Sequence, residues 1–144
     1  MRAKTTRGPA RAAGGSVAAA LLGALLATSA GCAAGGSPPS LRTPTEFDEQ
    51  VLKADRPVVV QFYSAGCLAC RAFAPTISSL HEEYRDRALF FKIERSEGAE
   101  LRVLFRVRAY PTVVLFVGGK EQSRWVNESS KKVYRQALDR ALAR

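Results

Sequence analysis

The feature that most constrains this 144-residue chain is a pair of cysteines placed between an apolar run and a helical segment. Residues 58–63 (Val-Val-Val-Gln-Phe-Tyr) form a short, nearly continuous apolar run, which is typical of a buried parallel strand. Cys67-Leu68-Ala69-Cys70 follows after three residues and opens a segment whose apolar residues recur at helical spacing. The sequence therefore predicts a strand that delivers two cysteines to the first turn of a helix.

That placement favours reactive sulfur chemistry. The first turn of a helix has unpaired N–H groups and a partial positive charge, and both favour a thiolate. Cysteines in such motifs have pKa values near 7 or lower, against about 8.5 for a free cysteine. The second sulfur lies one turn further on, close enough to form a disulfide with the first. Such a pair can take a disulfide from a partner through a mixed intermediate.

Apolar periodicity and turn residues predict eight elements. Helices are expected at about 43–54, 67–85, 99–105 and 130–142, and strands at about 58–63, 88–93, 112–117 and 122–126. The expected buried faces are Phe47, Val51 and Leu52 in the first helix, and Val133, Ala137, Leu138 and Ala141 in the last. Alternating helices and strands with a final hairpin indicate an α/β domain. We expect a mixed central sheet of about four strands, flanked by helices on both faces.

The first third of the chain has the composition of an export signal. Residues 1–16 are basic and lack acids, and residues 17–28 form an apolar run of signal-peptide length, shorter than the roughly 20 residues of a membrane span. Ser29-Ala30-Gly31-Cys32 follows and resembles the lipobox of bacterial lipoproteins. The resemblance implies removal of residues 1–31 and lipidation of Cys32. The alternative is an ordinary secretory signal cleaved near Ala30 or Ala34.

We therefore predict three segments. Residues 1–31 are a lipoprotein-type signal peptide, residues 32–42 carry the lipid anchor and a flexible tether, and residues 43–144 form the domain. The expected location is extracytoplasmic, on a bacterial membrane that faces the periplasm or the cell exterior. Disulfides can persist in such a compartment.

The charge distribution argues against a nucleic-acid partner. The formal net charge is +9, but four of the positive residues lie among the first eleven, and the others are interspersed with acids. No basic stripe with interleaved aromatic residues occurs. A single histidine, His81, with the cysteine pair falls short of the four ligands of a structural zinc site. We expect a monomer without metal or other cofactor, apart from a redox-active disulfide.

Several motifs in this order resemble the thioredoxin superfamily. They are the segment 47–55 before the central strand, the Cys67/Cys70 pair, Pro75 five residues further on, Lys92 on the next strand, and Tyr110-Pro111-Thr112. The last of these resembles the cis-proline site of the family and stands at the family's interval from the cysteines. The resemblance covers residues 43–142 and implies the thioredoxin fold.

The resemblance also implies roles for individual residues. Cys67 would be the exposed nucleophile and Cys70 the resolving thiol. Pro111 would follow a cis peptide bond and face the disulfide, and the backbone of Tyr110, with Gly66 beside the nucleophile, would contact an extended substrate. Gln61, Lys92 and Pro75 occupy supporting positions.

Some positions depart from the family. Gly66 replaces a tryptophan, Leu68-Ala69 replaces Gly-Pro, and no glycine stands in the last loop, residues 127–129. No strand is evident before Thr43, so the strand at 88–93 is expected to be a sheet edge. Gln61 replaces a buried acid and cannot titrate. Our hypothesis is that proton transfer at Cys70 is slower, or runs through water or Lys92.

Together these observations predict a thiol–disulfide oxidoreductase that reduces extracytoplasmic protein disulfides. The Cys-Leu-Ala-Cys motif is similar to the Cys-Val-Ala-Cys of the C-terminal domain of membrane thiol reductases of the DsbD type. The expected partners are protein thiols and disulfides and an electron donor, for which a membrane reductase of the DsbD or CcdA type is a candidate. Two other classes remain open: a non-catalytic binding or chaperone module that uses the cis-proline groove, and a metal carrier.

Overall fold

The computed structural model describes residues 36–144, so the predicted signal peptide and Cys32 lie outside the described residues. The first helical segment is α1, Pro44–Phe47, which continues as a π-helical turn, η1, Asp48–Leu52. The other helices are α2 (Leu68–Tyr84), α3 (Ala99–Leu104) and α4 (Lys131–Leu142). The strands are β1 (Val58–Tyr63), β2 (Leu89–Glu94), β3 (Thr112–Val117) and β4 (Lys120–Val126).

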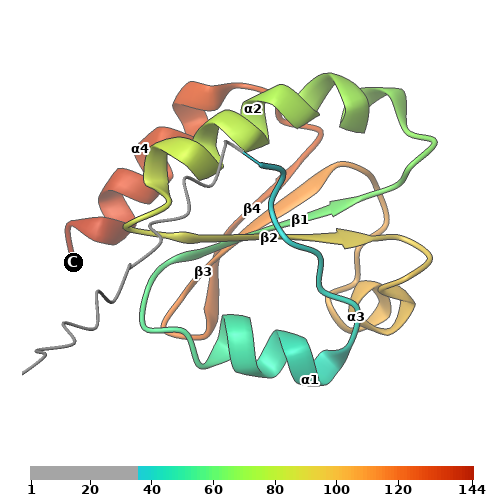
Figure 1. The fold of residues 1–144 in the computed structure, drawn as a ribbon, viewed down its shortest axis with the longest axis horizontal. Coiled ribbons are helices and arrows are strands. Elements are labelled where there is room, and N and C mark those ends of the chain that lie inside the picture. The colour runs from blue at the N-terminus through green and yellow to red at the C-terminus, as the bar shows by residue number, and fades with distance from the viewer. Residues whose placement is uncertain (1–35) are drawn as a thin grey trace, which may run out of the picture. The chain divides into compact units, whose positions relative to one another are not determined.

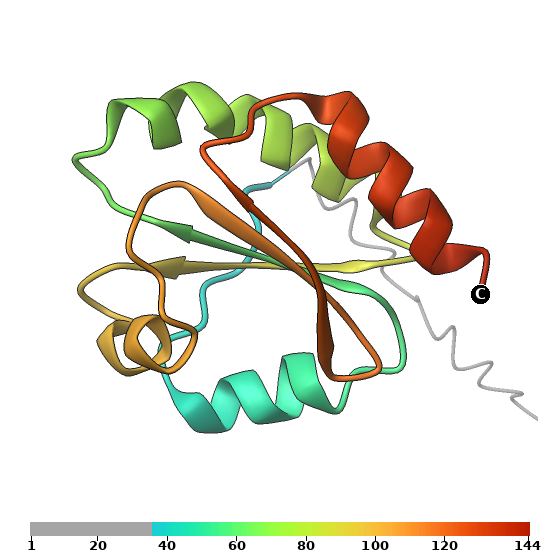
Figure 2. The same ribbon diagram turned by 180° about the vertical axis from the view of Figure 1, so that it is seen from behind.

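The four strands form one mixed sheet in the order β2-β1-β3-β4. β1 pairs in parallel with β2 and antiparallel with β3, and β3 and β4 form a hairpin. Helices α2 and α4 cover one face, and α1 and α3 cover the other (Figures 1 and 2). Each face has its own apolar core, one around Phe73 and Tyr134 and one around Phe47 and Leu101. The predicted α/β class and four-stranded sheet are confirmed.

The first helix begins where the sequence predicts but ends earlier. Thr43 caps it, because its hydroxyl accepts from the Glu46 N–H while the Glu46 carboxylate accepts from the Thr43 N–H. Phe47 and Val51 are buried. The prediction for Leu52 is wrong, since this side chain is 37% exposed. The Lys53 N–H bonds the Asp48 carbonyl, five residues back, and this wider turn ends the helical segment at Leu52.

The buried face of α4 also differs by one position from the prediction. Ala137, Leu138 and Ala141 are buried as expected, but Tyr134 rather than Val133 completes the face. The Tyr134 ring packs between the rings of Phe73 and Trp125, with centroid distances of 5.5 and 5.1 Å. These aromatic contacts come from α2 and β4, and helical spacing within α4 gives no information about them.

The residues just before the domain lie against the sheet and are not a free tether. We call residues 36–41 the strap. Pro38 and Leu41 are buried, and Ser40 pairs in parallel with Lys92 of β2. The Leu41 N–H donates to the Lys92 carbonyl, and the Lys92 N–H donates to the Pro39 carbonyl, both at 2.9 Å. The prediction of a flexible tether is therefore wrong for residues 38–41. β2 is the edge strand of the sheet, as expected, and the strap covers part of it.

Candidate active site

The end of β1 and the start of α2 place the two cysteines. Cys67 is the N-cap of α2, and its sulfur accepts the N–H of Cys70 at 3.1 Å. The Cys67 N–H in turn donates to the Ser64 carbonyl, which closes the loop between strand and helix. The sulfur thus takes the place that a Ser or Asp oxygen has at most helix starts. The structure does not join Cys67 and Cys70 by a disulfide bond.

The two thiols have opposite environments. Cys67 is partly exposed, whereas Cys70 is only 4% exposed. The Cys70 thiol acts as a hydrogen-bond donor to Cys67 and lowers the pKa of Cys67, and the N–H groups of Cys70 and Ala69 and the charge of Arg71 act in the same direction. Burial raises the pKa of Cys70 to about 11. The arrangement favours a thiolate at Cys67 and a proton at Cys70, as a nucleophile and a resolving thiol require.

A cis peptide bond between Tyr110 and Pro111 faces the dithiol. The expected cis geometry is confirmed, and the Tyr110 carbonyl lies 3.6 Å from the Cys67 sulfur. Hydrogen bonds hold this loop on both sides: the Thr112 hydroxyl donates to the Ala109 carbonyl, and the Asn127 N–H donates to the Pro111 carbonyl. Asn127 has a φ of +54°, so it adopts the left-handed conformation that glycine and asparagine tolerate best.

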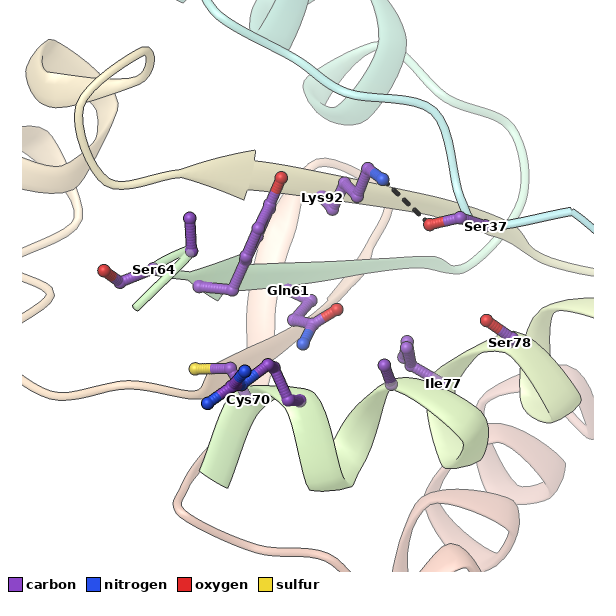
Figure 3. A pocket seen from close by; sticks show the side chains of 11 residues that line it. Ser37, Gln61, Ser64, Cys70, Ile77, Ser78 and Lys92 are labelled. Carbon is purple, nitrogen blue, oxygen red and sulfur yellow. Dashed lines mark hydrogen bonds between the residues drawn. The ribbon is translucent and has the colours of Figure 1, made fainter. Parts of the chain in front are cut away.

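A hollow lies behind the cysteine pair, between β1, β2, α2 and the strap (Figure 3). It has an empty volume of about 520 Å³ including its open mouth, and Cys70 and Gln61 lie on its wall. Gln61 and Lys92 are neighbours on adjacent strands. Gln61 is only 5% exposed, and no residue that the structure describes forms a hydrogen bond with its amide. The Lys92 ammonium donates to the Ser37 hydroxyl at 2.8 Å.

Glu94, to which the sequence analysis assigns no role, supports the active-site loop. The Glu94 carboxylate accepts the N–H groups of Ala65, Ser96 and Glu97 and the Ser96 hydroxyl. These bonds, above all those from Ser96, lower the pKa of Glu94 to about 2. Because Ala65 belongs to the loop before Cys67, Glu94 links the end of β2 to the active-site loop. An acid at the end of a strand, followed by Ser and Gly, is the sequence signal for such a turn.

Two other residues that contribute to the site were also missed. Arg71 directly follows the cysteine motif in the first turn of α2, and its charge acts on Cys67. This position alone could have identified it. Ser37 lies in the segment interpreted as a tether, and no sequence signal relates it to a lysine 55 residues away.

Gly66 and Pro75 are the other predicted site residues in the described part of the chain. Gly66 is exposed beside Cys67, and a Cβ added there would meet no atom within 4 Å. Pro75 lies inside α2. Within residues 36–144, no three His, Cys, Asp or Glu side chains converge in a way that could hold a metal ion. No helix in the same range has the length and apolar character needed to cross a bilayer.

The sheet order, the dithiol at the carboxyl end of β1 and the cis-proline beside it define the class of thioredoxin-fold dithiol domains. The sequence model of the thioredoxin family matches residues 39–140, and the chain belongs to this family.

Individual relatives agree with this assignment. The chain is 31% identical over 96 residues to chloroplastic thioredoxin M2 of Arabidopsis thaliana, a match that covers 67% of this chain and 52% of that protein. It is 28% identical over 100 residues to thioredoxin 1 of Nostoc, a match that covers 69% of this chain and 94% of that protein. It is 32% identical over 98 residues to thioredoxin-2 of Saccharomyces cerevisiae, and this match covers 68% of this chain and 92% of that protein. The chain thus spans about half the length of the Arabidopsis relative and nearly all of the other two.

Solved structures show the same fold. The thioredoxin of Malassezia sympodialis superposes with a TM-score of 0.66 at 22% identity, covering 74% of this chain and 91% of that one. A chain from a study of thiol resolution in yeast mitochondrial 1-Cys peroxiredoxin gives the same TM-score and the same identity. This superposition covers 73% of the present chain and 99% of that one.

Proposed function

We propose that the protein is a thiol–disulfide oxidoreductase that reduces protein disulfides outside the cytoplasm. The observation that carries this proposal is the contrast between the two thiols. Cys67 is partly exposed and has a lowered pKa, while Cys70 is buried beside it and has a raised pKa. Membership of the thioredoxin family supports the same chemistry.

The reaction follows from this contrast. The Cys67 thiolate attacks one sulfur of the substrate disulfide, the substrate S–S bond breaks, and one substrate thiolate leaves. Cys70 then loses its proton and attacks the Cys67 sulfur, which forms the Cys67–Cys70 disulfide and releases the second substrate thiolate. The Tyr110 carbonyl lies beside Cys67 and offers a backbone acceptor to an extended substrate segment.

The reducing direction is supported by the residues between the cysteines. Leu68 and Ala69 carry no charge that would stabilise the Cys67 thiolate further, so the reduced form is not strongly favoured. A reductase needs an electron donor, and a membrane reductase of the DsbD or CcdA type fits an extracytoplasmic location.

Redox titration and mutagenesis test the activity together. In the full chain with Cys32→Ser, we expect a potential near that of thioredoxin, about −270 mV, and catalysed reduction of a protein disulfide such as insulin. Cys67→Ser should abolish turnover, and Cys70→Ser should trap a mixed disulfide with the substrate. A potential near −120 mV would make the protein an oxidant. A binding module would keep its partner with Cys67→Ser and show no turnover.

The proposed membrane attachment depends on Cys32 and is tested separately. In a bacterial host, the full chain should incorporate labelled palmitate and fractionate with membranes. Cys32→Ser should lose the label. Processing without any label in the original chain would favour the ordinary secretory signal instead.

A further inference from the structure

Ser37, a residue of the strap, lies on the wall of the hollow behind Cys70. The strap is fixed at both ends: the His81 ring donates from Nδ1 to the Gly36 carbonyl at 3.1 Å, and Leu41 is buried in the core beside α1. Between these two anchors, Ser37 faces Lys92 across the rim of the hollow (Figure 3). A segment outside the cysteine motif therefore takes part in the surroundings of the dithiol.

The hollow contains positive charge but no carboxylate. The titratable or charged side chains on its wall are Tyr63, Cys70, Arg71 and Lys92, and Cys67 lies just beyond. Gln61 occupies the position between Lys92 and Cys70 but can neither take up nor release a proton. The resolving thiol therefore loses its proton to solvent at the open mouth. Backbone hydrogen bonds at Ser64 and Cys70 favour the resulting thiolate, and the positive side chains on the wall of the hollow can add to this effect.

We propose that Ser37 is a positioning residue of the redox site, which holds the Lys92 ammonium at the rim of the hollow so that its charge assists ionisation of Cys70. The inference rests on the proposed function, because it concerns the second step of that reaction. The Cys70 S–H gives its proton to solvent water. The thiolate then attacks the Cys67 sulfur, and the substrate sulfur leaves with the electron pair of the broken bond.

The direction of the effect follows from the hydration of lysine. A lysine ammonium is strongly hydrated and its stem is flexible, so without Ser37 it extends into bulk water. Water and salt screen its charge there, whereas the low-dielectric wall of the hollow transmits it to Cys70. Loss of Ser37 should therefore act in the same direction as loss of the lysine charge, but more weakly.

Stopped-flow reaction with the aromatic disulfide 5,5′-dithiobis(2-nitrobenzoate) separates the two steps. The reduced full chain with Cys32→Ser should release one coloured thiolate in a phase that depends on reagent concentration, when Cys67 attacks. A second thiolate should follow at a rate independent of reagent, when Cys70 attacks. We expect Ser37→Ala to slow the second phase about threefold at pH 7 and to shift its pH profile upward by about half a unit. The first phase should remain unchanged.

Matched variants identify the cause. Ser37→Thr should restore the second phase, and Ser40→Ala, in the same strap, should leave it unchanged. Lys92→Met should slow it at least as much as Ser37→Ala, and the double variant should be no slower than Lys92→Met alone. A second phase in Ser37→Ala equal to or faster than that of Ser40→Ala, or additive slowing in the double variant, would overturn the proposal. Absence of the first phase in the parent chain would instead contradict the proposed function.

Discussion

At the scale of single residues, Glu94 shows how a side chain can organise a redox loop without contacting either sulfur. Its carboxylate gathers three N–H groups and one hydroxyl, and one of these N–H groups belongs to the loop that leads to Cys67. Neutralising the carboxylate would weaken all four hydrogen bonds, because each is charge-assisted. Acid should therefore destabilise this end of the sheet.

The pH dependence has a definite sign. The pKa of Glu94 is about 2 in the folded protein against an ordinary value of 4.5, so its stabilising contribution is complete above about pH 4.5 and is lost between that pH and 2. We expect the free energy of unfolding to fall over this window, and to fall less in Glu94→Gln. Urea titrations at several pH values would measure this. Glu100→Gln, at an exposed position on α3, is the control and should follow the parent chain. Equal acid dependence in Glu94→Gln and the parent would contradict the assignment.

The residue scale is also where sequence reasoning is least complete. Cys67, Cys70 and Pro111 were predicted because their chemistry depends on local spacing and on a family motif. Arg71 could have been added from its place directly after the cysteine motif, whereas Glu94 and Ser37 act through contacts that form only when distant segments meet. The residue types involved, a serine and an acid in polar surroundings, are also common at positions without any role.

At the scale of elements, the strap stabilises the exposed edge of β2. Two backbone hydrogen bonds and one buried leucine secure it, and Leu41 is only 2% exposed. An uncovered edge strand presents unpaired N–H and C=O groups, and a short covering segment satisfies part of them. The strap, although only a few residues long, therefore covers part of the sheet edge as an additional strand would.

Removal of the Leu41 side chain should measure this contribution. We expect Leu41→Ala to lower the free energy of unfolding by about 2–4 kcal/mol, as for other fully buried leucines. The Lys92 N–H, which donates to the Pro39 carbonyl, should also exchange faster with solvent hydrogen. Leu52→Ala provides the comparison, because Leu52 is 37% exposed and its loss should cost less than about 1 kcal/mol. Similar costs for both variants would show that the strap is only loosely held.

Most elements were predictable because their patterns are local. The buried run of β1 was predicted at its observed bounds, and the other strands and helices within about two residues. The exceptions each depend on tertiary contacts. The strap needs β2 as its partner, the face of α4 is set by aromatic rings on α2 and β4, and η1 ends in a turn that apolar spacing does not reveal.

At the scale of the whole domain, the dithiol and Gly36, the first residue of the strap, lie near opposite ends of α2. Cys67 caps its first turn, and the strap begins at Gly36 beside His81 in its last turns. With 1.5 Å of rise per residue, these points are separated by about 20 Å. In Figure 1 the loop between β1 and α2 accordingly lies at the other end of the domain from the C-terminus.

This separation matters for any attachment of the domain to a surface or to another protein. An attachment at Gly36 itself would lie about 20 Å along α2 from the residue that caps its first turn, Cys67. A large substrate protein could then reach the dithiol without contacting the attachment point. Thiols of other proteins that lie flat against the surface to which the domain is attached would, in contrast, be out of reach of Cys67.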